Sequence, residues 1–210
     1  MSRMLAGRVL VPPREGVLAW QATMNASSLS VLVPTRGRPK RLRTLLNSLA
    51  ANTRYPERLT VWLGIDDDDE PTLTALAEIC ALPLTIKPLI QPRAATLGML
   101  WNSLYWQARP KADYYVCLVD DYVVEELGWD EITCQHLSKW PDGLALGYFP
   151  DPGIAMRDEV TIICATRRWL ELTNGIAWPL FRFWFIDSWQ DQIASMVGRK
   201  VRIPVRVAPS

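Results

Sequence analysis

Short apolar runs alternate with segments of helical periodicity along most of the chain. Residues 29–33 are aliphatic and β-branched, which predicts a buried strand, and the leucines within 39–51 recur at helical spacing. The same alternation predicts strands at 59–65, 84–90 and 114–119 and helices at 71–80, 93–107 and 129–140. Such repetition is typical of parallel sheets that are covered on both faces. We therefore expect an α/β fold with a mostly parallel central sheet and helices on both faces.

The pattern differs at the two ends of the chain. After about residue 143 it predicts strands at 144–149 and 160–165, helices at 167–172 and 186–197, and a last strand within 201–207. Residues 1–27 contain scattered charges and the pair Pro12-Pro13, so we expect a poorly structured leader before one domain at 28–210. Met24 is an alternative start of translation.

Composition excludes several classes of protein. The 210 residues suffice for one domain with a sizeable core, and 49% of them are hydrophobic. The formal net charge of +1 gives no general attraction to nucleic acid or to an anionic membrane. No run reaches the roughly 18 apolar residues that a membrane-spanning helix needs. We therefore expect no membrane partner and no general nucleic-acid binding.

The cysteines and the histidine narrow the possible metal chemistry. None of the four cysteines forms a Cys-x-x-Cys pair, so a zinc knuckle is unsupported. Cys80, Cys117 and Cys164 lie in apolar segments and are expected to be buried thiols, which suits a reducing, cytoplasmic location. His136 is the single histidine, which excludes a site built from several imidazoles.

The candidate chemistry follows the predicted strands. The first strand runs into Pro34-Thr35-Arg36-Gly37-Arg38, the second into Asp66-Asp67-Asp68-Asp69, and the fourth into Asp120-Asp121. Ligands of open α/β sheets bind beyond the carboxyl ends of the strands, so we expect these loops to converge. Carboxylates accept hydrogen bonds from a base or ribose and hold Mg²⁺ or Mn²⁺, and arginines pair with phosphate. Arg93, at the start of a predicted helix, adds a second basic element.

Each loop also has a plain structural interpretation. Aspartate-rich segments after strands are often turns and helix caps. The arginine pair alone is consistent with a solvated loop. The order of all three loops along one predicted sheet edge favours a binding site.

In order and spacing, these motifs resemble family 2 glycosyltransferases, most closely the small forms of bacteriophages and bacteria. The resemblance covers about residues 29–205 and is carried by 30–39, 65–69, 93–102, 118–121, 127–130, 167–169, 174–175 and 185–189. It implies a single GT-A domain. Within that domain, residues 28–125 would bind the nucleotide and 126–210 would form the acceptor side.

The resemblance also implies a reaction and its residues. An inverting enzyme would move a sugar from a nucleotide-diphosphate sugar, most commonly a UDP-sugar, to an acceptor hydroxyl. Asp187 would be the general base, with Asp191 on the same helix face as the rival, and Asp121 with Asp120 would hold Mn²⁺ or Mg²⁺. The remaining implied contacts are to the nucleotide, from Pro34, Thr35, Arg36, Arg38, Asp66, Asp67, Asp68, Arg93, Asn102 and Asp120, and to the acceptor, from Trp129, Asn174, Gly175 and Trp184.

Two departures keep other functions open. Tyr122 stands where a fuller DxD-type element has an acid or histidine, and residues 205–210 lack the histidine that relatives often place there. Both features favour a degenerate, non-catalytic nucleotide-binding module. A sugar-phosphate nucleotidyltransferase is the other alternative, although the first loop has one glycine, Gly37, and arginines instead of a lysine. The sugar, the nucleotide, the acceptor and the oligomeric state are not determined by the sequence.

Overall fold

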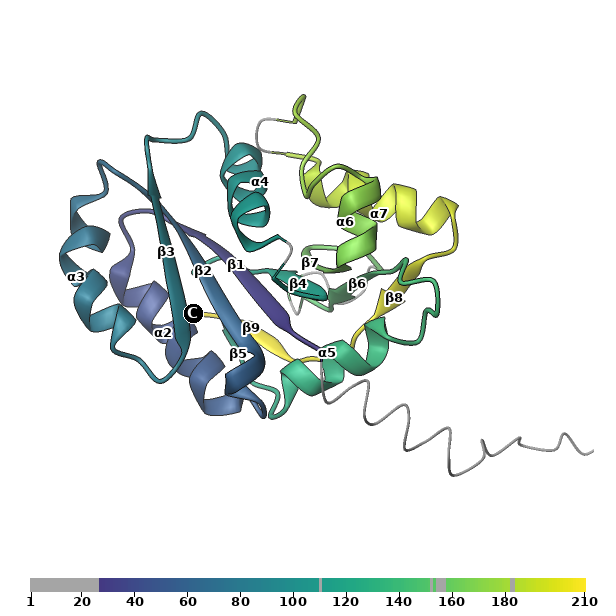
Figure 1. Cartoon of the computed structure of the whole chain (residues 1–210), viewed down its shortest axis with the longest axis horizontal. Helices are drawn as coiled ribbons and strands as arrows, with labels where there is room; N and C mark the ends of the chain where they lie inside the picture. Colours follow the sequence, from purple (N-terminus) through teal and green to yellow (C-terminus); the bar gives the residue numbers. More distant parts are fainter. Residues whose placement is uncertain (1–26, 110, 152, 154–157, 182–183) are drawn as a thin grey trace, which may run out of the picture.

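A computed structural model describes residues 27–109, 111–151, 153, 158–181 and 184–210. Residues 1–26 of the leader expected at 1–27, and with them the alternative start at Met24, lie outside these residues. The described chain folds around one central sheet with helices on both faces (Figure 1). None of the helices in these ranges is both long enough and apolar enough to span a bilayer.

Seven strands form the central sheet, in the order β3-β2-β1-β4-β7-β6-β8. Neighbours pair in parallel from β3 to β4, β7 runs antiparallel to both β4 and β6, and β8 is parallel to β6. The expectation of a mostly parallel sheet is therefore confirmed. The strands are β1 (Leu29–Thr35), β2 (Leu59–Asp66), β3 (Thr85–Gln91), β4 (Tyr114–Cys117), β6 (Leu146–Phe149), β7 (Ile162–Thr166) and β8 (Lys200–Arg202).

The helices divide between the two faces because side chains alternate along each strand. In β1, Val31 and Val33 face one hydrophobic core, and Leu32 between them faces the other. The first core is covered by α2 (Pro39–Asn52), α3 (Glu70–Cys80) and α5 (Trp129–Leu137). The second is covered by α4 (Leu97–Ala108), α6 (Arg167–Leu172) and α7 (Ile186–Met196), as Figure 1 shows. A short 3₁₀ helix, η1 (Pro56–Arg58), precedes β2.

Three expectations about local structure are wrong. The helix expected from residue 93 begins at Leu97, because the Thr96 hydroxyl accepts a hydrogen bond from the Met99 N–H at 3.1 Å and caps it there. The single last strand is two strands, β8 and β9 (Val207–Pro209), separated by a segment that contains Pro204. Cys80 is exposed at the end of α3, whereas Cys117 and Cys164 are buried as expected.

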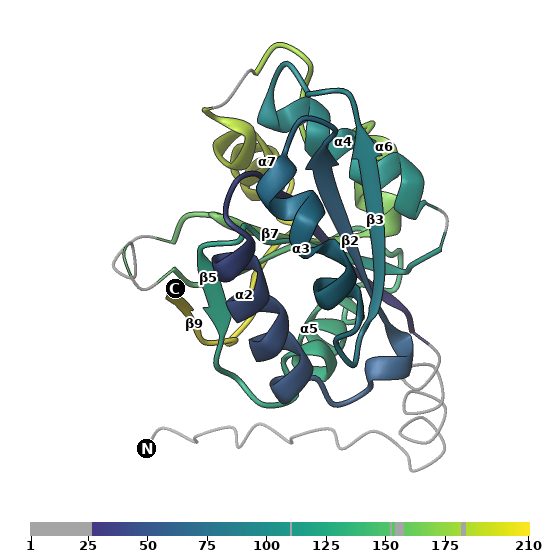
Figure 2. The same cartoon turned by 90° about the vertical axis from the view of Figure 1, so that its left-hand side faces the viewer.

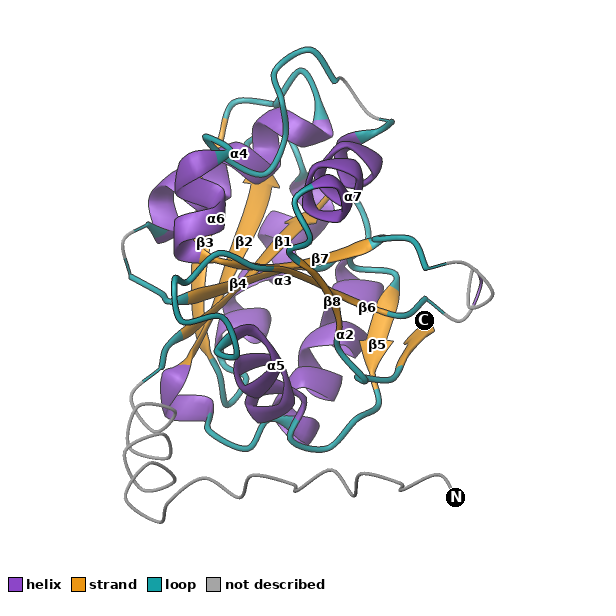
Figure 3. Ribbon diagram, turned by 90° about the vertical axis from the view of Figure 1, so that its right-hand side faces the viewer, coloured by secondary structure: helices purple, strands orange, loops and turns teal. Residues whose placement is uncertain are grey.

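A second, two-stranded sheet places the last described residues beside the end of β4. β5 (Tyr122–Val124), which the sequence pattern did not predict, pairs antiparallel with β9. Figures 2 and 3 show the C-terminal residue beside β5. The Ser210 N–H donates a 2.7 Å hydrogen bond to the Asp121 carbonyl, so this segment borders the acidic pair 120–121.

Candidate functional site

The three predicted loops meet at one edge of the sheet. β1 is flanked by β2 and β4, all parallel, so their carboxyl ends lie together. A pocket of about 470 Å³ opens there, within the size range of sites for small ligands and cofactors. Six of the ten residues predicted to contact a nucleotide line it: Pro34, Thr35, Arg36, Arg38, Asp66 and Arg93.

Arg36 joins the end of β1 to the end of β2. Its guanidinium lies 2.9 Å from Asp66 Oδ2 and donates to Asp68 Oδ2 at 3.0 Å. The hydrogen bond to Arg36 lowers the pKa of the Asp68 carboxyl, and the same pairing raises the pKa of Arg36. Asp66 is buried, and its other oxygen accepts from the Ala94 N–H at 3.2 Å. Asp66 therefore also fixes the loop that contains Arg93.

Asp69 has a structural role in this cluster. Its two carboxylate oxygens accept from the Gly37 N–H at 3.1 and 3.0 Å, and Oδ1 also caps α3 through the Thr72 N–H at 3.4 Å. Gly37 has a φ of 67°, a conformation that glycine adopts without strain. Asp67 is exposed, and its N–H donates to the Gln91 carbonyl at 2.8 Å.

The acidic pair 120–121 contacts two residues of the pocket lining, Thr35 and Arg38. Asp120 is fully buried; its Oδ2 accepts from the Thr35 hydroxyl at 2.7 Å, and its Oδ1 lies 2.8 Å from Arg38 Nη2. Burial raises the pKa of the Asp120 carboxyl, against the opposing effects of the Thr35 hydrogen bond and the Arg38 charge. Arg38 Nη1 is also 3.9 Å from Asp121 Oδ2. One guanidinium thus lies against both acids.

Solved structures of similar shape share this architecture, although no protein-family model and no curated protein matches the sequence. A mannosyltransferase from Pyrobaculum calidifontis, in complex with GDP-Man and Mn²⁺, superposes with a TM-score of 0.71 at 14% identity, over 90% of this chain and 61% of that one. TarS from S. aureus superposes with a TM-score of 0.66 at 18% identity, over 84% of this chain and 35% of that one. The chain has the GT-A fold.

A shorter form of TarS, solved in complex with UDP, has the same architecture. Its TM-score is 0.61 at 17% identity, and the match covers 85% of this chain and 59% of that one. Our chain thus spans between about a third and three fifths of the length of these three structures. The structural likeness establishes the GT-A fold. At sequence identities this low, activity has to be argued from the site.

Asp120 and Asp121 provide part of what a divalent cation requires. Asp121 Oδ1 is buried and has no hydrogen-bond partner among the described residues, which leaves it available to an ion. No group of three or more metal-binding side chains occurs in the described ranges. Mg²⁺ is commonly held by one or two carboxylates together with water and substrate phosphates, so two acids suffice when a diphosphate is present.

Tyr122 is not one of the ligands. Its hydroxyl donates to Asp151 Oδ2 at 2.5 Å, and burial together with Asp151 raises its pKa, so the phenol stays protonated. Asp151 was not among the residues predicted from the sequence. Because β6 runs in the same direction as β4, Asp151 follows a strand that ends at the same sheet edge. That direction was the missing signal.

Asn102 forms hydrogen bonds to a loop, and its predicted contact with a nucleotide stays a prediction. Its Oδ1 accepts from the Ile176 and Ala177 N–H groups at 2.9 and 3.0 Å, and its Nδ2 donates to the Ala177 carbonyl at 2.8 Å. Gly175 packs against the same amide; a Cβ there would lie 2.8 Å from Asn102 Oδ1. These contacts fix the 175–177 segment against α4, so that Gly175 has a packing role.

The other residues predicted on the acceptor side are scattered. Trp129 is fully buried on the α2 side of the sheet, and its Nε1 donates to Thr53 Oγ1 at 3.0 Å; the assignment to the acceptor is wrong, because no face is accessible. Asn174 and Trp184 are exposed. Arg167, in a segment that carried the family resemblance, pairs with Asp113 at the opposite sheet edge, because β7 runs antiparallel to β4.

The two candidate bases on α7 differ in their partners. Asp191 Oδ1 lies 2.7 Å from Lys200 Nζ, an ion pair that joins α7 to β8. Asp187 is half-buried and accepts from the Ser188 N–H at 2.8 Å. Its neighbour Ile186 packs beside Gly98, where an added Cβ would lie 3.2 Å from Ile186 Cδ1. Asp187 is therefore near the first turn of α4, although it is not among the residues that line the pocket at the ends of β1, β2 and β4.

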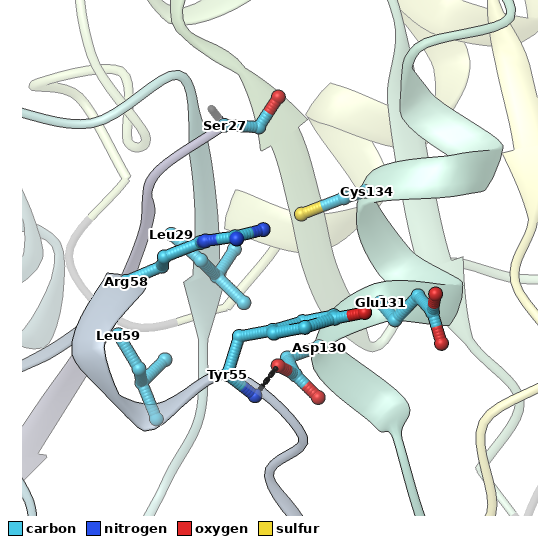
Figure 4. Close-up of a pocket in the computed structure, with 8 residues that line it drawn as sticks. All are labelled: Ser27, Leu29, Tyr55, Arg58, Leu59, Asp130, Glu131 and Cys134. Carbon is cyan, nitrogen blue, oxygen red and sulfur yellow. Dashed lines mark hydrogen bonds between the residues drawn. The ribbon is translucent and has the colours of Figure 1, made fainter. Parts of the chain in front are cut away.

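A small pocket at the opposite sheet edge does not compete as a ligand site. Figure 4 shows it near the starts of β1 and β2, between Tyr55, Arg58 and Cys134. Its volume is about 30 Å³, enough for one or two water molecules. The buried acid beside it, Asp130, accepts from the Arg54 and Tyr55 N–H groups at 2.8 and 2.9 Å. Both oxygens of that carboxylate therefore already accept hydrogen bonds from the backbone.

Proposed function

We propose that this chain is an inverting glycosyltransferase that uses a nucleotide-diphosphate sugar. The observation that carries the proposal is the pocket at the β1, β2 and β4 ends, where buried carboxylates and three arginines lie together. Asp66, Asp67 and Asp68 suit the base and ribose, and Arg36, Arg38 and Arg93 suit the diphosphate. The complexes of similar folds with GDP-Man and with UDP support a donor of this class, with a UDP-sugar the first to test.

The reaction requires an acceptor oxygen, a base and a stabilised leaving group. The acceptor hydroxyl oxygen attacks the anomeric carbon, and the bond to the diphosphate oxygen breaks with its electron pair leaving on that oxygen. Asp187 takes the hydroxyl proton, and arginines of the first loop pair with the developing negative charge. A divalent ion on Asp120 and Asp121 would supply further charge neutralisation when bound. Asp187 is the better base because Lys200 neutralises Asp191.

Aromatic side chains next to the donor pocket suit a carbohydrate acceptor. A pocket of about 230 Å³ shares Thr96 with the donor pocket and is lined by Met99, Trp106 and Trp178. The two indoles are partly exposed, and Trp178 packs on Trp189 with ring centroids 6.1 Å apart. Exposed indole faces stack on the apolar faces of sugar rings. Trp184, predicted to contact the acceptor, is 78% exposed and stays a prediction.

Calorimetric titration with UDP, GDP and ADP in the presence of Mn²⁺ tests the donor site. We expect one diphosphate to bind, and Asp66→Ala to weaken that binding at least tenfold. Arg43→Ala is the matched surface control, because Arg43 lies on the exposed side of α2 and pairs with Glu78 of α3. Absence of binding by all three nucleotides would remove the basis of the proposal.

A non-catalytic nucleotide-binding module is the second candidate. It is favoured by the engagement of Tyr122 with Asp151 and by the lack of a three-ligand metal group among the described residues. Turnover of UDP-sugars, followed as UDP release with and without a panel of sugar acceptors, separates the two. Nucleotide binding without any release in any condition would favour the module.

A further inference from the structure

A nearby cation stabilises the charged form of a fully buried carboxylate that lies next to a second acid. Asp120 is fully buried and adjacent in sequence to Asp121, and like charges this close disfavour joint ionisation. Arg38 supplies the positive charge, with Nη2 2.8 Å from Asp120 Oδ1 and Nη1 3.9 Å from Asp121 Oδ2. In the described structure the guanidinium stands where a divalent ion would contact both acids.

The contact is electrostatic and not a well-aligned hydrogen bond. Asp120 Oδ1 and Asp121 Oδ1 are buried and accept no hydrogen bond from any described residue, even though Arg38 is within ion-pair distance of both acids. Asp66 and Asp69, by contrast, receive aligned hydrogen bonds on both oxygens. The guanidinium therefore holds this pair by charge and can be replaced by another cation without breaking a directional bond.

The backbone around Arg38 is fixed while its side chain is accessible. Its carbonyl accepts from the Leu42 N–H at 3.0 Å at the start of α2, and Pro39 follows. The Arg38 side chain is 45% exposed and lines the donor pocket. It can therefore leave the acids and turn toward a ligand in the pocket without unfolding the loop.

We propose that Arg38 is the resident counter-cation of Asp120 and Asp121, and that it and a divalent ion occupy this position alternately. When an ion binds the acids, Arg38 is released toward the pocket. There it pairs with the diphosphate of the donor. The exchange of cations on the acids is the first half of the proposal; the pairing with the diphosphate is the second half, and it rests on the proposed function. Arg38 is thus a positioning residue that couples cation binding to recognition of the phosphates.

Mn²⁺ binding without nucleotide tests the first half. Free Mn²⁺ is measured by electron paramagnetic resonance during titration of the full chain. We expect Arg38→Met to bind Mn²⁺ more tightly than the unmodified chain by about tenfold or more, because a competing positive charge within about 4 Å is removed. Arg38→Lys, which keeps the charge, should remain close to the unmodified chain, and Arg38→Gln provides a second neutral variant should the methionine variant fail to fold.

Two controls make the result specific. Arg43→Met removes one positive charge from the surface of α2 and should leave Mn²⁺ affinity within about twofold. Asp121→Asn in the Arg38→Met background should abolish the gain. The proposal is overturned if both neutral Arg38 variants bind Mn²⁺ no better than Arg43→Met, or if the gain survives Asp121→Asn. These measurements do not depend on UDP binding or sugar transfer. The first half of the proposal can therefore fail while the proposed function stands, and the reverse also holds.

The second half is read from nucleotide affinity. With Mn²⁺ at saturating concentration, Arg38→Met should weaken binding of the diphosphate that the chain recognises by about tenfold, and binding of the corresponding nucleoside monophosphate by less. Equal losses for both nucleotides would show that Arg38 does not pair with the diphosphate.

Discussion

The Thr35 hydroxyl donates a 2.7 Å hydrogen bond to Asp120 Oδ2 inside the protein, and this contact joins the end of β1 to the end of β4. Both residues are buried, so the acid is oriented before any ligand arrives. Arg38 approaches its other oxygen. The geometry of the site therefore depends on a contact between the end of β1 and the loop that follows β4.

Removal of the Thr35 hydroxyl should destabilise the fold. Thr35→Val leaves a buried carboxylate oxygen without its donor, and we expect a loss of about 1–3 kcal/mol in the free energy of unfolding, measured with urea. Thr44→Val is the control, since its exposed hydroxyl bonds only within α2, and should change stability by about 0.5 kcal/mol or less. Equal effects of the two changes would contradict this role of Thr35.

Asp187→Asn should abolish sugar transfer and leave nucleotide binding nearly intact. A general base contributes about 10²–10⁴ in rate, whereas Asp187 does not line the donor pocket. The measurements are UDP release and the calorimetric dissociation constant. Asp191→Asn, which removes one of the acidic partners of Lys200, should retain most of the turnover. Undiminished turnover in Asp187→Asn would refute the assignment.

Asn102→Ala should reduce the stability of the fold more than it reduces nucleotide affinity. It removes three hydrogen bonds to the backbone of Ile176 and Ala177, and we expect a destabilisation of about 2 kcal/mol or more with little change in nucleotide affinity per folded molecule. Asn47→Ala, on the exposed side of α2, is the control for thermal and urea unfolding. A large loss of nucleotide affinity with unchanged stability would support the predicted nucleotide contact.

Tyr115 should make the fold sensitive to alkaline pH. Burial raises the pKa of its phenol to about 12, because the charged form is disfavoured in the core. The resulting stability is fully present below the unfolded pKa of about 10 and is lost as pH rises toward about 12.

Tyr115→Phe should therefore reduce the loss of unfolding free energy between pH 9 and 11. Its hydroxyl has no hydrogen-bond partner among the described residues, so at neutral pH the change should cost little or be stabilising. Tyr55→Phe, at a half-buried position, should leave the alkaline loss unchanged. An identical pH profile for Tyr115→Phe and the unmodified chain would contradict this assignment.

Sequence pattern alone predicted the strands that build the site. Strands that are apolar throughout and buried on both faces are readable from local composition, which is why β1, β2 and β4 and the three loops after them were located correctly. β5 and β9 were missed because three-residue strands carry too short a pattern, and they form only where each finds the other.

Side-chain partners were decided by tertiary structure. Trp129 and Asn102 resemble ligand contacts in sequence, yet one fills the core against Thr53 and the other fixes a loop some 75 residues away. Asp191 became a partner of Lys200, and Arg38 of Asp120. The sequence determined which residues could carry charge at the strand ends, since that depends on local order along the chain. Only the folded arrangement of strands decided which charges meet, because hydrogen bonds and ion pairs act over a few ångströms between segments far apart in sequence.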